Sequence, residues 1–217
     1  MALRGPRQIV TAKTGETRER IMRVGEELFA RRGIASTSMR MVATSAGQAN
    51  VAAVQYHFGS KEGLIEAIFK DRVEQMEGPR TVMLAAIGDV SEATFRQILE
   101  IIFRPYLDLV DGAGNHVYAR LLLDYLSRYG RFMMPHPARD TEESELVINR
   151  VLLELERRLD KAGITGARAP YLMMVTGLLG ALNDYDLRRE KGMDVRPISE
   201  LLEELTDFMA RALCPDE

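Results

Sequence analysis

The chain has 217 residues, 46% of them hydrophobic, and a net charge of −3 at pH 7, which is ample for a packed core in one or two domains. No run of about eighteen apolar residues occurs, so we expect no membrane span. One cysteine, Cys214, excludes an internal disulfide, and the N-terminus lacks the apolar segment of a secretory signal. We therefore expect a cytoplasmic protein.

The charge is divided along the chain. Residues 1–61 hold ten Lys or Arg and four Glu, a balance of +6, whereas the remainder holds 19 basic and 28 acidic residues, a balance of −9. A local basic surface is enough to attract phosphate. The negative overall charge therefore does not exclude a nucleic-acid partner for the N-terminal part.

Residues 1–15 lack hydrophobic periodicity and contain two glycines and a proline, so we predict a disordered arm there. Its basic residues Arg4, Arg7 and Lys13 could enter the minor groove of DNA. The alternative interpretation is a flexible terminus that does not bind. The first helix is predicted over about residues 16–32. Its apolar stripe consists of Ile21, Val24, Leu28 and Phe29.

Residues 38–61 predict two short helices, a tight turn between them and the start of a third helix. Apolar residues recur on one face of the first of these helices, at Met39, Val42, Ala43 and Ala46. Gly47 supplies the backbone freedom that a helix end needs. Asn50 is expected to cap a helix that begins at Val51, and Ser60 to cap the longer one. This is a helix-turn-helix, whose second helix fits the major groove of DNA.

The second short helix has two different faces. Val54 and Phe58, four residues apart, are predicted to point inward. Outside, Gln55 can pair with the N6/N7 edge of adenine, and small apolar side chains fit against a thymine methyl group. Polar side chains near the helix end, at Tyr56, His57 and Lys61, can donate to phosphate oxygens. The alternative is a plain helical hairpin in which His57 is buried and Lys61 is solvated.

A long ordered pattern runs from Thr17 to about Phe69. The residues that carry it are Thr17-Arg18, Ile21, Leu28-Phe29, Gly33, Thr37-Ser38, Val42-Ala43, Ala46-Gly47, Tyr56-His57-Phe58-Gly59-Ser60-Lys61 and Leu64. This pattern resembles the DNA-binding domain of the TetR family of bacterial transcriptional regulators, over about the first third of the chain. Two departures leave open which side chains read bases. One residue is added before Tyr56, most simply at Gln48, and position 55 is Gln where the family usually has Tyr.

The resemblance implies an all-α protein with a DNA-binding domain at about 1–69 and an effector-binding and dimerisation domain over 70–217. It also implies that the chain at Ser38 and Arg40 meets DNA, although a capping role can be the whole purpose of Ser38. The candidate DNA contacts are Ser38, Arg40, Asn50, Val51, Ala52, Gln55, Tyr56, His57 and Lys61.

The remainder of the chain has helical periodicity almost to its end. Gly78-Pro79 is predicted to break or bend the helix that begins at Lys61, and Pro105 to kink a later one. Further helices are predicted over about 115–129, 140–162, 169–191 and 199–213. A Pro-rich loop, 130–137, separates the first two of these, and its His136 is interpreted as an exposed loop residue in preference to a ligand.

The helix predicted over 169–191 is nearly continuously apolar in its middle and contains Gly177 and Gly180. Burial in the monomer's own core is one explanation. The resemblance implies the other, a homodimer whose interface is formed by the helices at about 140–162 and 169–191. The final helix is a candidate extension of that interface. Its residues predicted to face inward are Leu201, Leu202, Leu205 and Phe208.

Aromatic and methionine side chains of the second domain are candidates for an apolar effector pocket, although such residues at helical spacing also build ordinary cores. They are Phe103, Tyr106, Tyr118, Leu122, Tyr125, Met173 and Met174. No cofactor is predicted.

Enzymes are the competing class. The sequence has no G-x-S-x-G, no phosphate-binding Gly-Lys-Ser/Thr loop and no His-Glu-x-x-His. None of its three histidines has a Glu three residues before it, which argues against a di-iron site, and no metal site is predicted. The sequence favours a homodimeric repressor that binds a palindromic operator and is released by a small molecule. An activator, a partner-controlled regulator and a non-specific architectural DNA-binding protein remain alternatives.

Overall fold

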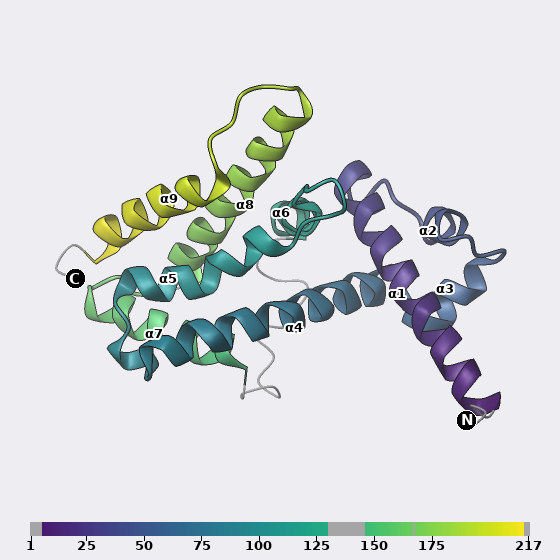
Figure 1. The fold of residues 1–217 in the computed structure, drawn as a ribbon, viewed down its shortest axis with the longest axis horizontal. Coiled ribbons are helices and arrows are strands. Elements are labelled where there is room, and N and C mark those ends of the chain that lie inside the picture. The colour runs from purple at the N-terminus through teal and green to yellow at the C-terminus, as the bar shows by residue number, and fades with distance from the viewer. Residues whose placement is uncertain (1–5, 130–145, 167, 215–217) are drawn as a thin grey trace, which may run out of the picture. The chain divides into compact units, whose positions relative to one another are not determined.

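The computed structural model of the chain describes residues 6–129, 146–166 and 168–214. Over these residues it consists of helices and connecting segments without a strand, in agreement with the predicted all-α class. None of the described helices is long and apolar enough to cross a membrane. In the order seen in Figure 1, the elements are α1 (Pro6–Arg32), α2 (Met39–Ser45), α3 (Val51–Phe58), α4 (Lys61–Ile87), η1 (Val90–Glu92), α5 (Phe95–Phe103), η2 (Arg104–Asp108), α6 (Val117–Tyr129), α7 (Val147–Lys161), α8 (Arg168–Glu190) and α9 (Ile198–Leu213).

The chain divides into two compact units, and the division falls within α4 between Asp71 and Arg72. The first unit contains α1, α2, α3 and the beginning of α4. The second contains the rest of α4 and all later elements. Each unit has its own buried core.

The first helix begins earlier than the sequence suggested. We predicted a disordered arm over 1–15, whereas α1 starts at Pro6 and continues through Gly15 without interruption. Proline is tolerated at the first position of a helix, because its missing N–H has no intrahelical partner there. An internal glycine costs a helix only about 1 kcal/mol relative to alanine. These two residues were therefore weaker breakers than we assumed, and Arg4 lies outside the described residues.

The core of the first unit is formed by apolar side chains that α1, α2, α3 and α4 direct toward one another. The fully buried members are Ile21, Phe29, Ile34, Val42, Val54 and Leu64. At Gly25 of α1 an added Cβ would lie 3.0 Å from Cδ2 of Leu64. The absence of a side chain at this glycine therefore lets α1 and α4 approach each other closely.

In the second unit α5 is the central helix. It packs against both α7 and α9, while α8 packs against α6 and α9. Most of its residues are buried, namely Phe95, Ile98, Leu99, Ile101, Ile102 and Phe103. Thr94 and Gln97 form a capping box at its start, each side chain accepting the backbone N–H of the other residue. Helices α8 and α9 begin within one residue of the predicted starts.

The two prolines of this unit behave differently. Pro79 lies inside α4, which continues to Ile87, so the helix does not break there, and the predicted alternative of a bend stays a prediction. Pro79 is exposed, and water can therefore hydrate the carbonyl that its missing N–H leaves free. At Pro105 the predicted kink is replaced by a helix end, because α5 ends at Phe103 and a 3-10 helix that contains Pro105 follows. The predicted loop 130–137, including His136, and the first residues of the helix predicted from 140 lie outside the described residues.

Candidate functional sites

The two short helices are capped by side chains that we had also considered as DNA contacts. The hydroxyl of Ser38 accepts the backbone N–H of Met41 at 3.2 Å. The side-chain oxygen of Asn50 accepts the N–H of Ala52 at 3.0 Å. Both residues have the extended backbone conformation of an N-cap. The predicted capping roles are confirmed, and Ser38 and Asn50 are occupied within the protein.

The turn after α2 accommodates the additional residue. Gly47 has a φ of +67°, a value at which a side chain would be strained. Its N–H donates to Thr44 at 3.1 Å, and the N–H of Gln48 reaches back to Ala43 at 2.9 Å. These two bonds form a Schellman motif, the common way of ending a helix at glycine. Gln48 is thus part of the turn, and α3 begins only after it.

Helix α3 presents the predicted faces. Val54 and Phe58 are buried, whereas Ala52, Gln55 and Tyr56 are exposed at i, i+3 and i+4. Tyr56 has 82% of its surface accessible. Positions three and four apart share one helix face, so these three side chains make a continuous outward strip. Val51 and His57 are half-buried beside it.

Lys61 donates hydrogen bonds within the protein. Its ammonium group donates to the carbonyl of Ile34 at 2.7 Å and to that of Thr37 at 2.9 Å. Both carbonyls belong to the connection between α1 and α2, so Lys61 braces that connection from the start of α4. A lysine ammonium has three N–H donors, and two of them are used inside the protein. Lys61 therefore has a structural role that we did not predict from the sequence, and its contact with phosphate stays a prediction.

Two arginines of α1 also hold the helix-turn-helix, and sequence reasoning assigned them no such role. The Nε group of Arg20 donates to the carbonyl of Ala46, at the end of α2, at 3.1 Å. The guanidinium of Arg18 lies 5.4 Å from the ring centre of Phe58, a cation–π contact. Partners up to forty residues apart in sequence leave no periodic signal, so neither contact was predictable from spacing.

The exposed side of α2 carries one predicted contact and one residue that we overlooked. Arg40 is exposed, as a phosphate contact requires, and Thr44 is exposed one helical turn later. The four-residue spacing, which places both on one face, was the available signal for Thr44.

The junction of α3 and α4 depends on Gly63. A Cβ at this position would overlap the carbonyl of Phe58. The N–H of Gly63 donates to the hydroxyl of Ser60, which confirms Ser60 as the cap of α4. Hydrogen bonds from its own backbone N–H and from Ser60 lower the pKa of the neighbouring Glu62, which keeps a negative charge at the helix N-terminus, where it is stabilising.

Comparison with known proteins matches the same segment. Residues 21–68 match the family model of bacterial regulatory proteins, tetR family. The chain carries the N-terminal domain of the TetR family. A relative in Bacillus subtilis (strain 168), "Probable HTH-type transcriptional regulator YttP", is 30% identical over 114 residues, which are 50% of this chain and 52% of that protein. The aligned region thus spans about half the length of this curated relative.

Solved structures extend the likeness in fold to the whole chain. The fatty acid degradation regulator FadR from Bacillus halodurans has a TM-score of 0.54 and 16% identity, with 98% of this chain and 99% of that one covered. A protein studied for the control of antibiotic production by bacterial hormones has a TM-score of 0.53 and 22% identity, over 91% and 97% of the two chains. The unit behind the TetR-family domain therefore has the helical fold of such proteins.

Six of the seven residues predicted to form an effector pocket are buried in the second unit. Those that are buried are Phe103, Tyr106, Tyr118, Leu122, Tyr125 and Met174. The rings of Tyr106 and Tyr118 stack with centres 6.0 Å apart. Met173 is 73% exposed, so its assignment to an interior pocket is wrong. The next residue along α8, Met174, takes the inward position instead.

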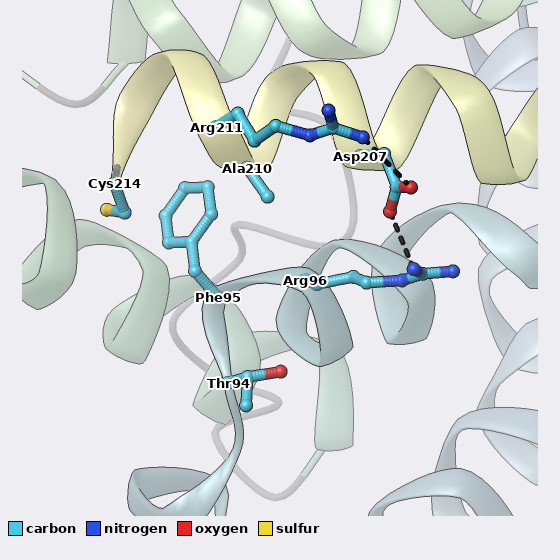
Figure 2. A pocket seen from close by; sticks show the side chains of 7 residues that line it. All are labelled: Thr94, Phe95, Arg96, Asp207, Ala210, Arg211 and Cys214. Atoms are coloured by element: carbon cyan, nitrogen blue, oxygen red, sulfur yellow. Dashed lines mark hydrogen bonds and ion pairs between the residues drawn. The ribbon is translucent and has the colours of Figure 1, made fainter. Parts of the chain in front are cut away.

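A cavity that sequence reasoning missed lies between the start of α5 and the end of α9 (Figure 2). Its volume is about 340 Å³. Asp207 crosses part of it, paired with Arg96 at 2.6 Å and with Arg211 at 3.4 Å. Its wall is completed by Thr94, Phe95, Ala210 and Cys214. Because its charges are already paired with one another and none of the predicted pocket residues line it, we assign it no ligand.

Two buried polar residues join α6 to α8. Asp186 is inaccessible to solvent and accepts the backbone N–H of His116 at 2.6 Å, while its other oxygen lies 2.9 Å from Nδ1 of the same histidine. His116, directly before α6, is 3% exposed and has Asp186 as its partner. Its role in the structure is to fix the beginning of α6.

Proposed function

We propose that this chain is a sequence-specific DNA-binding transcriptional regulator, and that it acts as a cytoplasmic homodimeric repressor. The observation that carries the proposal is the outward strip of α3. Val54 and Phe58 anchor the helix, while the polar and small residues Ala52, Gln55 and Tyr56 face solvent. A short helix held this way by caps and a turn is suited to lie in the major groove.

The contacts we propose follow from the chemistry of the strip. Gln55 pairs with adenine, and Ala52, with Val51 beside it, contacts a thymine methyl group. Tyr56, His57 and Arg40 donate to phosphate oxygens, which fixes the helix in the groove without reading sequence. Thr44 joins Arg40 in this role. The side chains of Ser38 and Asn50 act as N-caps and are not proposed as DNA contacts, although the backbone around them can still approach DNA.

A homodimer is proposed because one short helix contacts few bases, whereas two related by a two-fold axis read a palindrome. The predicted interface paired the helices at 140–162 and 169–191. Apolar exposure now favours α8 together with α9, because Phe208 of α9, which we had predicted to face inward, is 71% exposed and Met173 of α8 is similarly open. Gly177 on the same side of α8 is exposed as well, and a Cβ there would lie 3.6 Å from Cε of Met209, so its small size also serves the contact of α8 with α9 in the same chain.

Release by a small molecule is proposed for the second unit. Its core of stacked and buried aromatic side chains suits an apolar ligand. One neighbour of similar fold was studied for the control of antibiotic production by bacterial hormones, and we extend to this chain only the idea of a diffusible signal. A ligand changes DNA binding only if it has different affinities for the DNA-bound and free states.

The test is selection of bound duplexes from a random pool at physiological salt, with wild type and a Gln55→Ala variant. We expect an enriched inverted repeat, and a loss of preference at one position of each half-site in the variant. Retention of DNA without an enriched motif would instead favour an architectural protein. Transcription from a template that carries the selected site then separates a repressor from an activator.

Dimerisation has its own test in a matched pair of variants. Phe208→Asp on α9 should shift the sedimentation of the protein from dimer to monomer. Leu153→Asp on α7, which is 67% exposed, should leave the dimer intact. The opposite outcome would return the interface to the helices first predicted.

A further inference from the structure

Arg80, on the part of α4 that belongs to the second unit, is a charged side chain in the core. It is only 2% exposed and ranks among the largest fully buried side chains of the described residues. One guanidinium nitrogen donates to Glu77 at 3.2 Å and another to the sulfur of Met76 at 3.5 Å. Its Nε group is buried and has no hydrogen-bond partner.

This arrangement leaves a cation poorly satisfied. A guanidinium carries five N–H donors, and a thioether is a weak acceptor. Burying a charge costs several kcal/mol unless good partners offset it, and a buried donor without a partner costs about 1–3 kcal/mol. An acceptor that reached Arg80 would therefore gain more here than at an ordinary surface arginine.

Glu77 cannot give its whole charge to Arg80. Its second oxygen accepts the N–H of Val147 at 2.7 Å, and the oxygen facing Arg80 also lies 3.4 Å from the N–H of Ile148. These are the first N–H groups of α7, which have no partner within their own helix. The carboxylate is thus shared between α7 and Arg80, and the positive charge of Arg80 is only partly compensated.

Aromatic side chains share the buried core of the second unit with Arg80. Tyr106 is 4% exposed, and its ring stacks on that of Tyr118 of α6. Burial raises the pKa of the Tyr106 hydroxyl, whereas the positive charge of Arg80 acts to lower it. Arg80 therefore belongs to the same core as the aromatic pair that we associate with effector binding.

We propose that Arg80 anchors the effector, and that the effector is a carboxylate attached to an apolar or aromatic body. The body would pack against Tyr106 and Tyr118, and the carboxylate would accept from Nε and a neighbouring N–H of Arg80 in the forked geometry that arginine favours. A phosphate ester fits less well, because one arginine supplies too few donors for a doubly charged group in an apolar core. This inference rests on the proposed function and specifies its ligand class.

The same contacts would let a bound ligand change how α4 and α7 are held together. A carboxylate at Arg80 competes with Glu77 for the same guanidinium. Glu77 holds the N-terminus of α7, so binding changes the contact between α4 and α7. That is the kind of differential contact that an effector needs in order to shift an equilibrium between two states.

The experiment is calorimetric titration of the full chain, without DNA, with two matched pairs of probes: decanoate and decanamide, and cinnamate and cinnamamide. We expect at least one acid to bind with a Kd below about 1 mM, and its neutral amide to bind at least about tenfold more weakly. The variant Arg80→Met should lose about 10- to 100-fold in affinity for the acid and bind acid and amide alike. Arg96→Met, on α5 and outside the aromatic cluster, should bind as wild type does.

Folding of the variants is checked by circular dichroism and thermal unfolding. Arg80→Met removes one partner of the ion pair with Glu77, so we expect it to lower stability, although Glu77 keeps its bonds to α7. Should Arg80→Met fail to fold, Arg80→Lys keeps the charge but lacks the fork, and it should still prefer acid over amide at lower affinity. Binding of neither acid, equal binding of acid and amide, or an undiminished acid preference in Arg80→Met overturns the proposal.

These outcomes are separable from those of the DNA selection. If an inverted repeat is enriched but neither acid binds, the regulator stands and the ligand class is wrong. If an acid binds through Arg80 but no DNA is retained with or without it, the proposed function fails and the binding site stands.

Discussion

For Lys61, the role predicted from the sequence differs from the role seen in the structure, and a single substitution can distinguish the two. As a phosphate contact, it would weaken DNA binding when removed and leave folding unchanged. In the structure its ammonium donates to the carbonyls of Ile34 and Thr37. The substitution Lys61→Met keeps most of the aliphatic stem and removes both hydrogen bonds, so it tests the second role with little change in packing.

The expected loss follows from the two bonds. Hydrogen bonds that involve a charged group contribute about 1.5–3 kcal/mol each. Lys61 is only half-buried, so water replaces part of the interaction, and we expect a total of about 2–3 kcal/mol in the free energy of unfolding. If the first unit unfolds on its own, its midpoint should fall by about 10 °C or more, because a domain of this size loses about 4–8 °C per kcal/mol.

The assay combines urea unfolding with DNA affinity measured across salt concentrations, well below the melting temperature. Arg40→Met is the matched control, since Arg40 is exposed and proposed to meet phosphate. In the control, the slope of log binding constant against log salt concentration should become shallower by about 0.9, and stability should not change. Lys61→Met should lower stability and leave this slope unchanged. A Lys61→Met protein as stable as wild type, with a reduced slope, would refute the structural role.

Substitutions at three further positions probe the stability of the two units. Gly63→Ala should destabilise the first unit by about 2 kcal/mol or more, because its Cβ would overlap the carbonyl of Phe58. The readout is the loss of DNA binding on mild heating. Unchanged stability would count against the observed junction of α3 and α4. Asn50→Ala removes the cap of α3 and should cost about 1 kcal/mol, measured by urea unfolding, whereas Asn50→Gly should cost less. Hydrogen bonds from Arg157 lower the pKa of Glu154, so Glu154 stabilises the second unit above its unfolded pKa of about 4.3, and that contribution disappears as pH falls through the lowered folded value. Glu154→Gln should therefore be less stable than wild type at pH 7, with the gap closing in acid; a gap independent of pH would contradict the ion pair.

Local signals explain how much of the first unit was predictable. Caps and turn residues act within a few positions of themselves, so Asn50, Gly47 and Ser60 could be assigned from sequence and are confirmed. The inward pair Val54 and Phe58 followed from helical spacing in the same way. What sequence could not give was the direction of long charged side chains, whose partners depend on how helices meet.

The second unit shows the limits of periodicity. The positions of α8 and α9 were predicted closely, yet Phe208 and Met173 were placed on the wrong side. Apolar spacing identifies a stripe on a helix, but an apolar residue at the edge of the stripe can face either the core or a partner. The effect of Pro79 was hard to predict for a related reason, since it depends on whether its side of the helix faces solvent.

Charged side chains of this protein lie in its interior as well as on its surface. Lys61 satisfies carbonyls between α1 and α2, and Asp186 is buried with His116 in the second unit. In both cases the charged group meets partners that compensate for the loss of water, as burial demands. Nε2 of His116 has no partner, but both oxygens of the charged Asp186 do. Arg80 differs because the unpartnered Nε belongs to the charged group itself, and its carboxylate neighbour is shared with α7. The fold alone does not offset the free energy of burying the Arg80 guanidinium, but a ligand that supplies the missing acceptor would. This contrast with Lys61 and Asp186 is why we assign Arg80 to binding.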